Sequence, residues 1–107
     1  MFHIKSSIVT AHAIVHSRKS VEVIAGSNIV PVCGKKFVEK NDKYYLLRRR
    51  LIESKIIKNG TFVSNYEFSS LSAAAAVILG RSTNGRIEWL NEDNVAYADL
   101  EQVEIRP

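Results

Sequence analysis

Positively charged side chains gather near the middle of this 107-residue chain, and of all its residues they are the best suited to bind a ligand. Arginine presents a planar fork of N–H donors that matches the oxygens of a phosphate group, and lysine supplies a compact positive charge. Tyr44 and Tyr45 lie among these residues and would add aromatic surface for stacking. A solvated helix face without a ligand is the alternative interpretation of the same pattern. The basic residues are Lys35, Lys36, Lys40, Lys43, Arg48, Arg49 and Arg50.

The charge of the whole chain is unevenly distributed. The net charge is +4, but residues 1–58 hold 12 Lys and Arg against 4 Asp and Glu, whereas residues 59–107 hold 3 against 7. The first part is therefore +8 and the second −4. A polarised layout of this kind suits a polyanion on one face, although proteins that bind no polyanion also have it.

A nuclease-like set of residues is present but badly placed. Asp42 and the triplet Glu53-Ser54-Lys55 resemble the Asp and Glu-x-Lys residues with which many nucleases hold a divalent ion. That chemistry needs the Glu and the Lys on a strand, where both point inward. Here they fall at the end of a predicted helix, where positions so close in sequence diverge. Metal-dependent cleavage is therefore the least favoured function.

Other reactive residue types lack the partners that chemistry would need. His12 and His16 fall in a β-branched stretch, which separates them too widely for a shared metal ion. The serines at positions 69, 70 and 72 have no nearby base, so helix capping is the preferred role. Cys33 is the single cysteine and lies beside Gly34 and two lysines. We interpret it as a small apolar residue and not as a catalytic thiol. We predict no catalytic residue, no metal site, no cofactor and no enzymatic activity.

Length and composition predict one domain spanning residues 1–107. Hydrophobic residues make up 46% and charged residues 24% of the chain, as in ordinary globular domains. A single cysteine excludes an internal disulfide and favours a reducing compartment. No stretch approaches the roughly 20 apolar residues that cross a bilayer, and the N-terminal residues lack the apolar run of a signal peptide. We expect a cytoplasmic protein that does not bind membranes.

The first half of the chain predicts a β-hairpin followed by a helix. A β-branched strand is expected from Ile4 to Val15, a turn at residues 17–20 and a second strand from Val21 to Ala25. Residues 34–36 are expected to be loop. An amphipathic helix would then run from about Val38 to Ser54, with Tyr44, Leu47, Leu51 and Ser54 on its inner stripe and the basic residues mostly outside it.

The second half predicts another hairpin, a short core helix and closing strands. Asn59-Gly60 is a strong hairpin signal. The run Leu71 to Leu79 contains four consecutive alanines, follows a serine cluster and ends at Gly80, as a capped helix does. Asn84-Gly85 is expected to be a turn, with strands at Arg86 to Leu90 and Val95 to Tyr97 and an alternating acidic tail at residues 100–105. The predicted fold is a small α+β domain in which two hairpins and closing strands pack with two helices.

Residues 66–89, YEFSSLSAAAAVILGRSTNGRIEW, carry a familiar pattern. They resemble a small domain of unknown function found after GIY-YIG nuclease domains and in bacterial restriction-modification proteins, which is similar in turn to the RAMA domain. The resemblance covers about residues 20–100 and includes Val23 to Ser27 and the Arg48 to Ile52 helix. The matching positions in the second half are Tyr66, Phe68, Ser70, Ser72, Ala73, Ala74, Ala75, Val77, Leu79, Gly80, Arg81, Asn84, Gly85 and Trp89.

Three positions depart from the family pattern. Leu71 stands where the family has Pro, and Asn65 stands where it has Asp. Lys55 replaces the Gly usual at the end of the first helix, which implies either a left-handed Lys or a different helix stop. No GIY-YIG nuclease half is present in these 107 residues, so the resemblance implies a recognition or accessory module and gives no support for cleavage.

The predicted function follows from the charge and from this resemblance. The chain would bind DNA, or recognise modified DNA, as a non-enzymatic module of a restriction-modification or nuclease system. The alternative is a protein interaction module that docks onto a nuclease or methyltransferase partner. Arg48, Arg49 and Arg50 would contact phosphate, and Lys40 and Lys43 would also belong to the nucleic-acid-binding surface. A small polar site at the ends of the alanine helix would consist of Ser72, Arg81, Asn84 and Arg86.

Overall fold

The computed structural model describes residues 1–105, with side chains described through Glu101, and contains a four-stranded antiparallel sheet. The strand order is β1-β2-β3-β6, and each neighbouring pair is antiparallel. The α+β class is confirmed, since five helices accompany the strands within the described residues. The strands of the sheet are β1 (Phe2–Lys5), β2 (Thr10–Ser17), β3 (Ser20–Val23) and β6 (Tyr66–Phe68).

The sheet buries one face through side chains that alternate along its strands. In β2, Ala11 and Ala13 are fully buried whereas His12 is exposed. The expected single strand from Ile4 to Val15 is wrong, because the chain turns between β1 and β2. There the Ser6 N–H donates to the Val9 carbonyl at 2.9 Å, and the Ser6 hydroxyl accepts from the Val9 N–H at 3.1 Å.

A second, two-stranded sheet is the predicted Asn59-Gly60 hairpin, which is confirmed. It consists of β4 (Ile57–Lys58) and β5 (Thr61–Phe62). Asn59 and Gly60 have φ values of 54° and 76°. Positive φ at both central residues is what the tight two-residue hairpin turn requires, and Asn-Gly reaches it at low cost.

Two helices replace the single helix expected from Val38 to Ser54. They are α1 (Lys35–Glu39), which begins in the stretch expected to be loop, and α2 (Lys43–Glu53). Asn41 breaks the helix with a φ of 48°, and the Asp42 carboxylate caps α2 by accepting from the Tyr44 N–H at 2.8 Å. After α2, Lys55 adopts the left-handed conformation with a φ of 65°, in the place where the resembling family has glycine.

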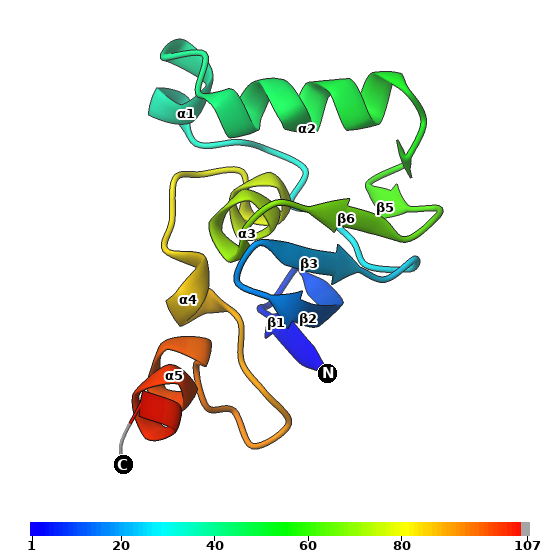
Figure 1. Cartoon of the computed structure of the whole chain (residues 1–107). Coiled ribbons are helices and arrows are strands. Elements are labelled where there is room, and N and C mark those ends of the chain that lie inside the picture. The colour runs from blue at the N-terminus through cyan, green and yellow to red at the C-terminus, as the bar shows by residue number, and fades with distance from the viewer. Residues whose placement is uncertain (106–107) are drawn as a thin grey trace.

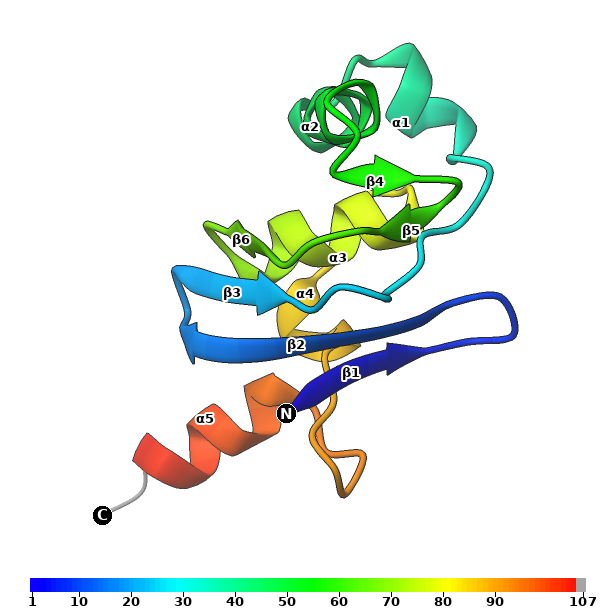
Figure 2. The same ribbon diagram turned by 90° about the vertical axis from the view of Figure 1, so that its right-hand side faces the viewer.

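The alanine helix α3 (Leu71–Leu79) forms as predicted and lies between the sheet and α2 (Figures 1 and 2). Its start is capped by the Ser70 hydroxyl, which accepts from the Ala73 N–H at 2.9 Å, and it ends at left-handed Gly80. Seven of its nine residues are buried, including all four alanines. The small side chains let neighbouring elements approach α3 from both sides.

The Ser70 cap gives a testable stability effect. A Ser70→Ala variant is expected to lose about 1 kcal/mol of unfolding free energy, because the Ala73 N–H loses its acceptor. Urea denaturation measures this loss. Ser69→Ala is the matched control, since the neighbouring Ser69 is exposed and caps nothing. Equal stability of the two variants would show that the cap contributes nothing.

The chain after α3 differs from the expected closing strands. Residues 85–88 form a short helix, α4 (Gly85–Glu88), because the Asn84 side chain caps it by accepting from the Arg86 N–H at 3.0 Å. The predicted Asn-Gly turn and the strand from Arg86 to Leu90 are therefore wrong. Only Leu90 has strand-like pairing, with His3 and Ala96. Residues 97–105, expected to be a strand end and a tail, form helix α5 (Tyr97–Ile105).

The helices α1 and α2 lie at one end of the molecule and α5 at the other (Figures 1 and 2). The domain measures 46 × 27 × 26 Å, so these ends are well separated. Within residues 1–105, no helix is long and apolar enough to cross a bilayer.

Candidate nucleic-acid interface

The C-terminal end of α3 determines where the basic residues lie. A helix leaves its last carbonyls without intrahelical partners. Here the Val30 N–H donates to the Ile78 carbonyl at 2.9 Å, and the Gly34 N–H donates to the Gly80 carbonyl at 2.7 Å. The segment 30–34 is thereby fixed across the end of α3, and α1 begins immediately after it.

This arrangement brings cations from two separate segments around one hollow. The hollow has a volume of about 440 Å³ and lies where α1 meets the loop that follows α3. Lys35, Lys36 and Lys40 come from α1 and its C-cap, and Arg81 comes from the loop. We call this hollow, with its four positively charged residues, the cationic hollow. The remaining lining residues are Gly34, Phe37, Asp42 and Ser82.

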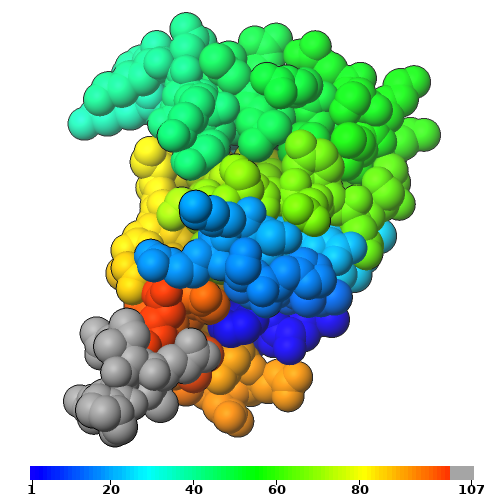
Figure 3. All heavy atoms as spheres, in the orientation of Figure 1, coloured from blue at the N-terminus to red at the C-terminus, as the bar shows by residue number. Residues whose placement is uncertain are grey.

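The outer face of α2 continues the positive surface. Lys43, Arg49 and Arg50 are all exposed, and residues of α1 and α2 form one continuous layer at the top of Figure 3. We call the cationic hollow together with these three residues the basic layer. Four acids partly neutralise it: Asp42 lines the hollow, and three glutamates form ion pairs. The pairs are Lys35 with Glu39 at 3.8 Å, Arg49 with Glu53 at 3.7 Å and Arg81 with Glu88 at 3.2 Å.

Four cations of the basic layer remain without a counter-charge. Among the residues whose side chains are described, none forms an ion pair with Lys36, Lys40, Lys43 or Arg50. Lys43 instead lies over the Tyr44 ring, 5.0 Å from its centroid. Exposed, unpaired cations are the ones free to exchange their counterions for phosphate.

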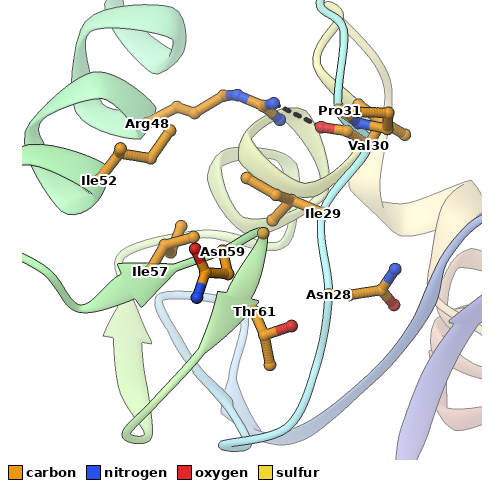
Figure 4. A pocket seen from close by; sticks show the side chains of 10 residues that line it. Asn28, Ile29, Val30, Pro31, Arg48, Ile52, Ile57, Asn59 and Thr61 are labelled. Atoms are coloured by element: carbon orange, nitrogen blue, oxygen red, sulfur yellow. Dashed lines mark hydrogen bonds between the residues drawn. The ribbon is translucent and has the colours of Figure 1, made fainter.

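Arg48 does not belong to this surface, and the prediction that it contacts phosphate is wrong. It is 5% exposed and points inward from α2 (Figure 4). Its guanidinium donates to the Val77 carbonyl at 2.8 Å and also to the Val30 carbonyl. It thus caps α3 and holds the 30–34 segment. Burial lowers the pKa of Arg48 from its ordinary value, but a guanidinium stays charged in proteins.

A second hollow, of about 420 Å³, lies beside Arg48 between α2, the β4–β5 hairpin and residues 28–31 (Figure 4). Aliphatic side chains such as Ile29, Ile52 and Ile57 and the polar residues Asn28, Asn59 and Thr61 line it. Its one cation, Arg48, is already bonded to backbone carbonyls. This hollow therefore lacks the free positive charge that a phosphate needs.

The four residues of the predicted polar site gather around α4, and each is engaged in a bond within the fold. Asn84 caps α4, and the Ser72 hydroxyl accepts from the Gly85 N–H at 3.0 Å. Arg81 pairs with Glu88, and Arg86 pairs with Glu101 at 2.6 Å. Of the four, Arg81 alone lines the cationic hollow.

Sequence reasoning missed two residues with functional potential, Arg18 and Glu101. Arg18 lies in the β2–β3 turn and Glu101 on α5, and they pair at 3.0 Å. Nothing local in the sequence predicts a contact between residues so far apart. The clustering of Lys35 and Lys36 was recognised, but their place beside Arg81 depends on the path of residues 30–34.

The residues considered for metal chemistry do not converge. Asp42 caps the start of α2 and Glu53 ends it, so about 16 Å of helix separates them. His12 is exposed on β2, and His16 bonds with Glu22 at 2.9 Å. That bond and one from Asn65 lower the pKa of Glu22. Within the described part of the chain, no three His, Cys, Asp or Glu residues lie close enough to hold a metal ion.

The fold and the basic layer together define a small α+β domain that presents a positive surface at one end. The chain belongs to the family described as "Domain of unknown function (DUF4357)", which it matches over residues 2–101. The match extends farther toward the N-terminus than the region of about 20–100 recognised by resemblance, and so includes β1 and β2. No curated protein and no solved structure matches the chain.

Proposed function

We propose that this domain binds duplex DNA through phosphate contacts of its basic layer and catalyses no reaction. The cationic hollow is the observation that carries the proposal, because it joins positive side chains from α1 and from the loop after α3. Lys43, Arg49 and Arg50 extend the positive surface along α2. A row of exposed cations from rigid elements suits a regular array of phosphates better than one isolated anion.

The proposal includes a biological setting that the family resemblance suggests. The domain would act in the cytoplasm as an accessory module of a restriction-modification or nuclease system, related to the domains found with GIY-YIG nucleases and to the RAMA domain. Recognition of modified bases would be a further property of the same module. Comparing methylated and unmethylated duplexes of one sequence tests that property directly.

A salt titration against duplex DNA tests the binding. Fluorescence anisotropy should show affinity that falls linearly with the logarithm of salt concentration. With about five phosphates neutralised, the slope of log K against log salt would be roughly −4 to −5. Absence of wild-type binding even at low ionic strength would overturn the proposal.

Single substitutions locate the interface. Ala at Lys36, Lys40, Lys43 or Arg50 should each weaken binding several-fold and reduce the salt slope by about 1. Lys5→Ala is the matched control, because Lys5 is equally exposed but lies on β1, outside the basic layer. If Lys5→Ala weakens binding as much as the others, only the net charge of the protein matters.

Docking onto a nuclease or methyltransferase partner is the second candidate, and exposed aliphatic side chains favour it. Val38, Leu46 and Ile52, on α1 and α2, are 37–43% exposed. Leu46 lies beside Arg49 and Arg50. Leu46→Ser should abolish capture of such a partner and leave the DNA salt slope unchanged. Loss of partner capture in Arg50→Ala but not in Leu46→Ser would exclude an apolar contact at this place.

A further inference from the structure

Two arginines from distant parts of the chain hold one carboxylate. Arg18 Nε lies 3.0 Å from one oxygen of Glu101, and Arg86 Nε lies 2.6 Å from the other. The side chains of the arginines are 65% and 42% exposed, whereas that of Glu101 is 13% exposed. Solvent and dissolved ions therefore reach the two guanidinium groups, which we call the arginine pair.

The arginine pair borders a hollow rich in hydrogen-bond donors. The hollow has a volume of about 200 Å³ and is lined by Arg18, Ser70, Leu71, Ser72 and Arg86. The two serine hydroxyls accept from backbone N–H groups but donate to no described residue, so their O–H hydrogens remain available. The terminal Nη groups of both arginines likewise donate to none of the described residues. Up to Glu101, the last residue whose side chain is described, no carboxylate lines the hollow itself.

Among the side chains that the structure describes, the charges at this place do not balance. Glu101 brings one negative charge to the two positive ones of Arg18 and Arg86, so these three groups sum to +1. Guanidinium groups bind phosphate oxygens with the same planar, charge-assisted geometry that they use for carboxylates. The two guanidinium groups thus hold the Glu101 carboxylate in a way that they can also hold a phosphate.

We propose that the arginine pair is a phosphate-binding site that Glu101 fills in the free protein. The proposal rests on the DNA-binding function inferred above, because it takes the ligand to be a backbone phosphate of the bound duplex. Arg86 lies in α4, five residues after Arg81 of the cationic hollow. In Figure 3 the yellow segment that includes α4 lies between the basic layer and the start of α5, on one face. One DNA backbone following that face would reach both places and displace the Glu101 carboxylate.

Inorganic phosphate is the first probe. Its binding is monitored through changes in the NMR chemical shifts of the backbone amides. Glu101→Gln keeps the shape of the side chain and removes its charge. This variant should bind phosphate roughly tenfold more tightly than wild type, with shifts at Arg18, Ser70, Ser72 and Arg86. Arg18→Ala in the same background should remove the gain; Arg18 lies in an exposed turn, so its loss leaves the core intact.

Glu92→Gln is the matched control, because Glu92 also lies in the acidic second part of the chain (residues 59–107), but its one ion pair with the described residues is with the N-terminus, at 3.5 Å. An equal gain in Glu92→Gln, or an absence of shifts at the four residues, would overturn the proposal.

Duplex DNA is the second probe and separates the two proposals. If the arginine pair binds a DNA phosphate, Glu101→Gln tightens duplex binding several-fold and Glu92→Gln does not. If wild type binds the duplex through the basic layer and Glu101→Gln adds nothing, the inference about the arginine pair fails alone. If no variant binds the duplex while phosphate still titrates the arginine pair, the DNA-binding function fails and so does the assignment of this site to DNA.

Discussion

A Gly85→Ala variant is expected to be largely unfolded at temperatures where the wild-type protein is stable. A Cβ atom on Gly85 would lie 2.1 Å from the Leu71 carbonyl carbon, 2.2 Å from the Leu71 oxygen and 2.4 Å from the Ser72 nitrogen. All three are backbone atoms at the start of α3, so no side-chain rotation relieves the overlap. A substitution of this kind would cost at least ~4 kcal/mol, much of the stability of a domain of this size.

Circular dichroism during urea and thermal denaturation measures this effect. Gly34→Ala is the control, since the same substitution there meets only ordinary contacts, 3.6 Å from the Gly80 oxygen and 3.8 Å from Arg81 Cβ. The control should lose no more than about 1 kcal/mol. A Gly85→Ala protein as stable as Gly34→Ala would mean that α4 can move away from α3 at little cost.

Replacing Arg48 by Met is expected to destabilise the domain by about 2–4 kcal/mol and to leave the contacts between the domain and DNA unchanged. Methionine fills a similar volume but leaves the buried carbonyls of Val30 and Val77 without their charged donor. The stability of Arg48→Lys should lie between those of the wild type and Arg48→Met, because an ammonium group cannot reproduce the planar fork that spans both carbonyls. Urea denaturation gives the loss for each variant.

Arg49→Met is the control for Arg48, one residue away on the exposed side of α2. It loses the long surface pair with Glu53 and the contact of its guanidinium with the Tyr45 ring, 5.9 Å from the ring centroid, so its stability should change by less than about 1 kcal/mol. In DNA titrations the pattern should reverse, with a salt slope reduced by about 1 for Arg49→Met and unchanged for folded Arg48→Met. If Arg48→Met reduced the salt slope and left the stability unchanged, Arg48 would have to be an exposed residue that contacts phosphate.

Local signals predicted those parts of the fold that depend on neighbouring residues. Asn59-Gly60 specifies its hairpin through the backbone conformations that these two residues tolerate. Ser70 and Gly80 mark the ends of α3 because capping is a matter of a few adjacent residues. Asn41-Asp42 is also a local signal, because it forms the break between α1 and α2. The helical spacing of apolar residues on both sides instead predicts one continuous helix.

The remaining differences come from contacts between segments far apart in the sequence. Asn84-Gly85 has the composition of a hairpin turn, yet the Ser72 hydroxyl and the close approach to Leu71 make it the start of α4. Arg48 resembles its neighbours Arg49 and Arg50 in type. Its spacing of four from Tyr44 and three from Leu51 places it on the inner side of α2, where it meets the Val77 carbonyl of α3, 29 residues away. Of the predicted binding residues, Lys40, Lys43, Arg49 and Arg50 are exposed on one layer, as surface charges of a helix ought to be.

The basic layer gathers positive charge at the end of the molecule where α1 and α2 lie, and this uneven placement gives the domain an electric dipole. Such a dipole would rotate the domain toward a polyanion before the two touch, so encounters would begin with the correct end foremost. Physiological salt screens this steering beyond about 8 Å, so it acts only over the last part of the approach.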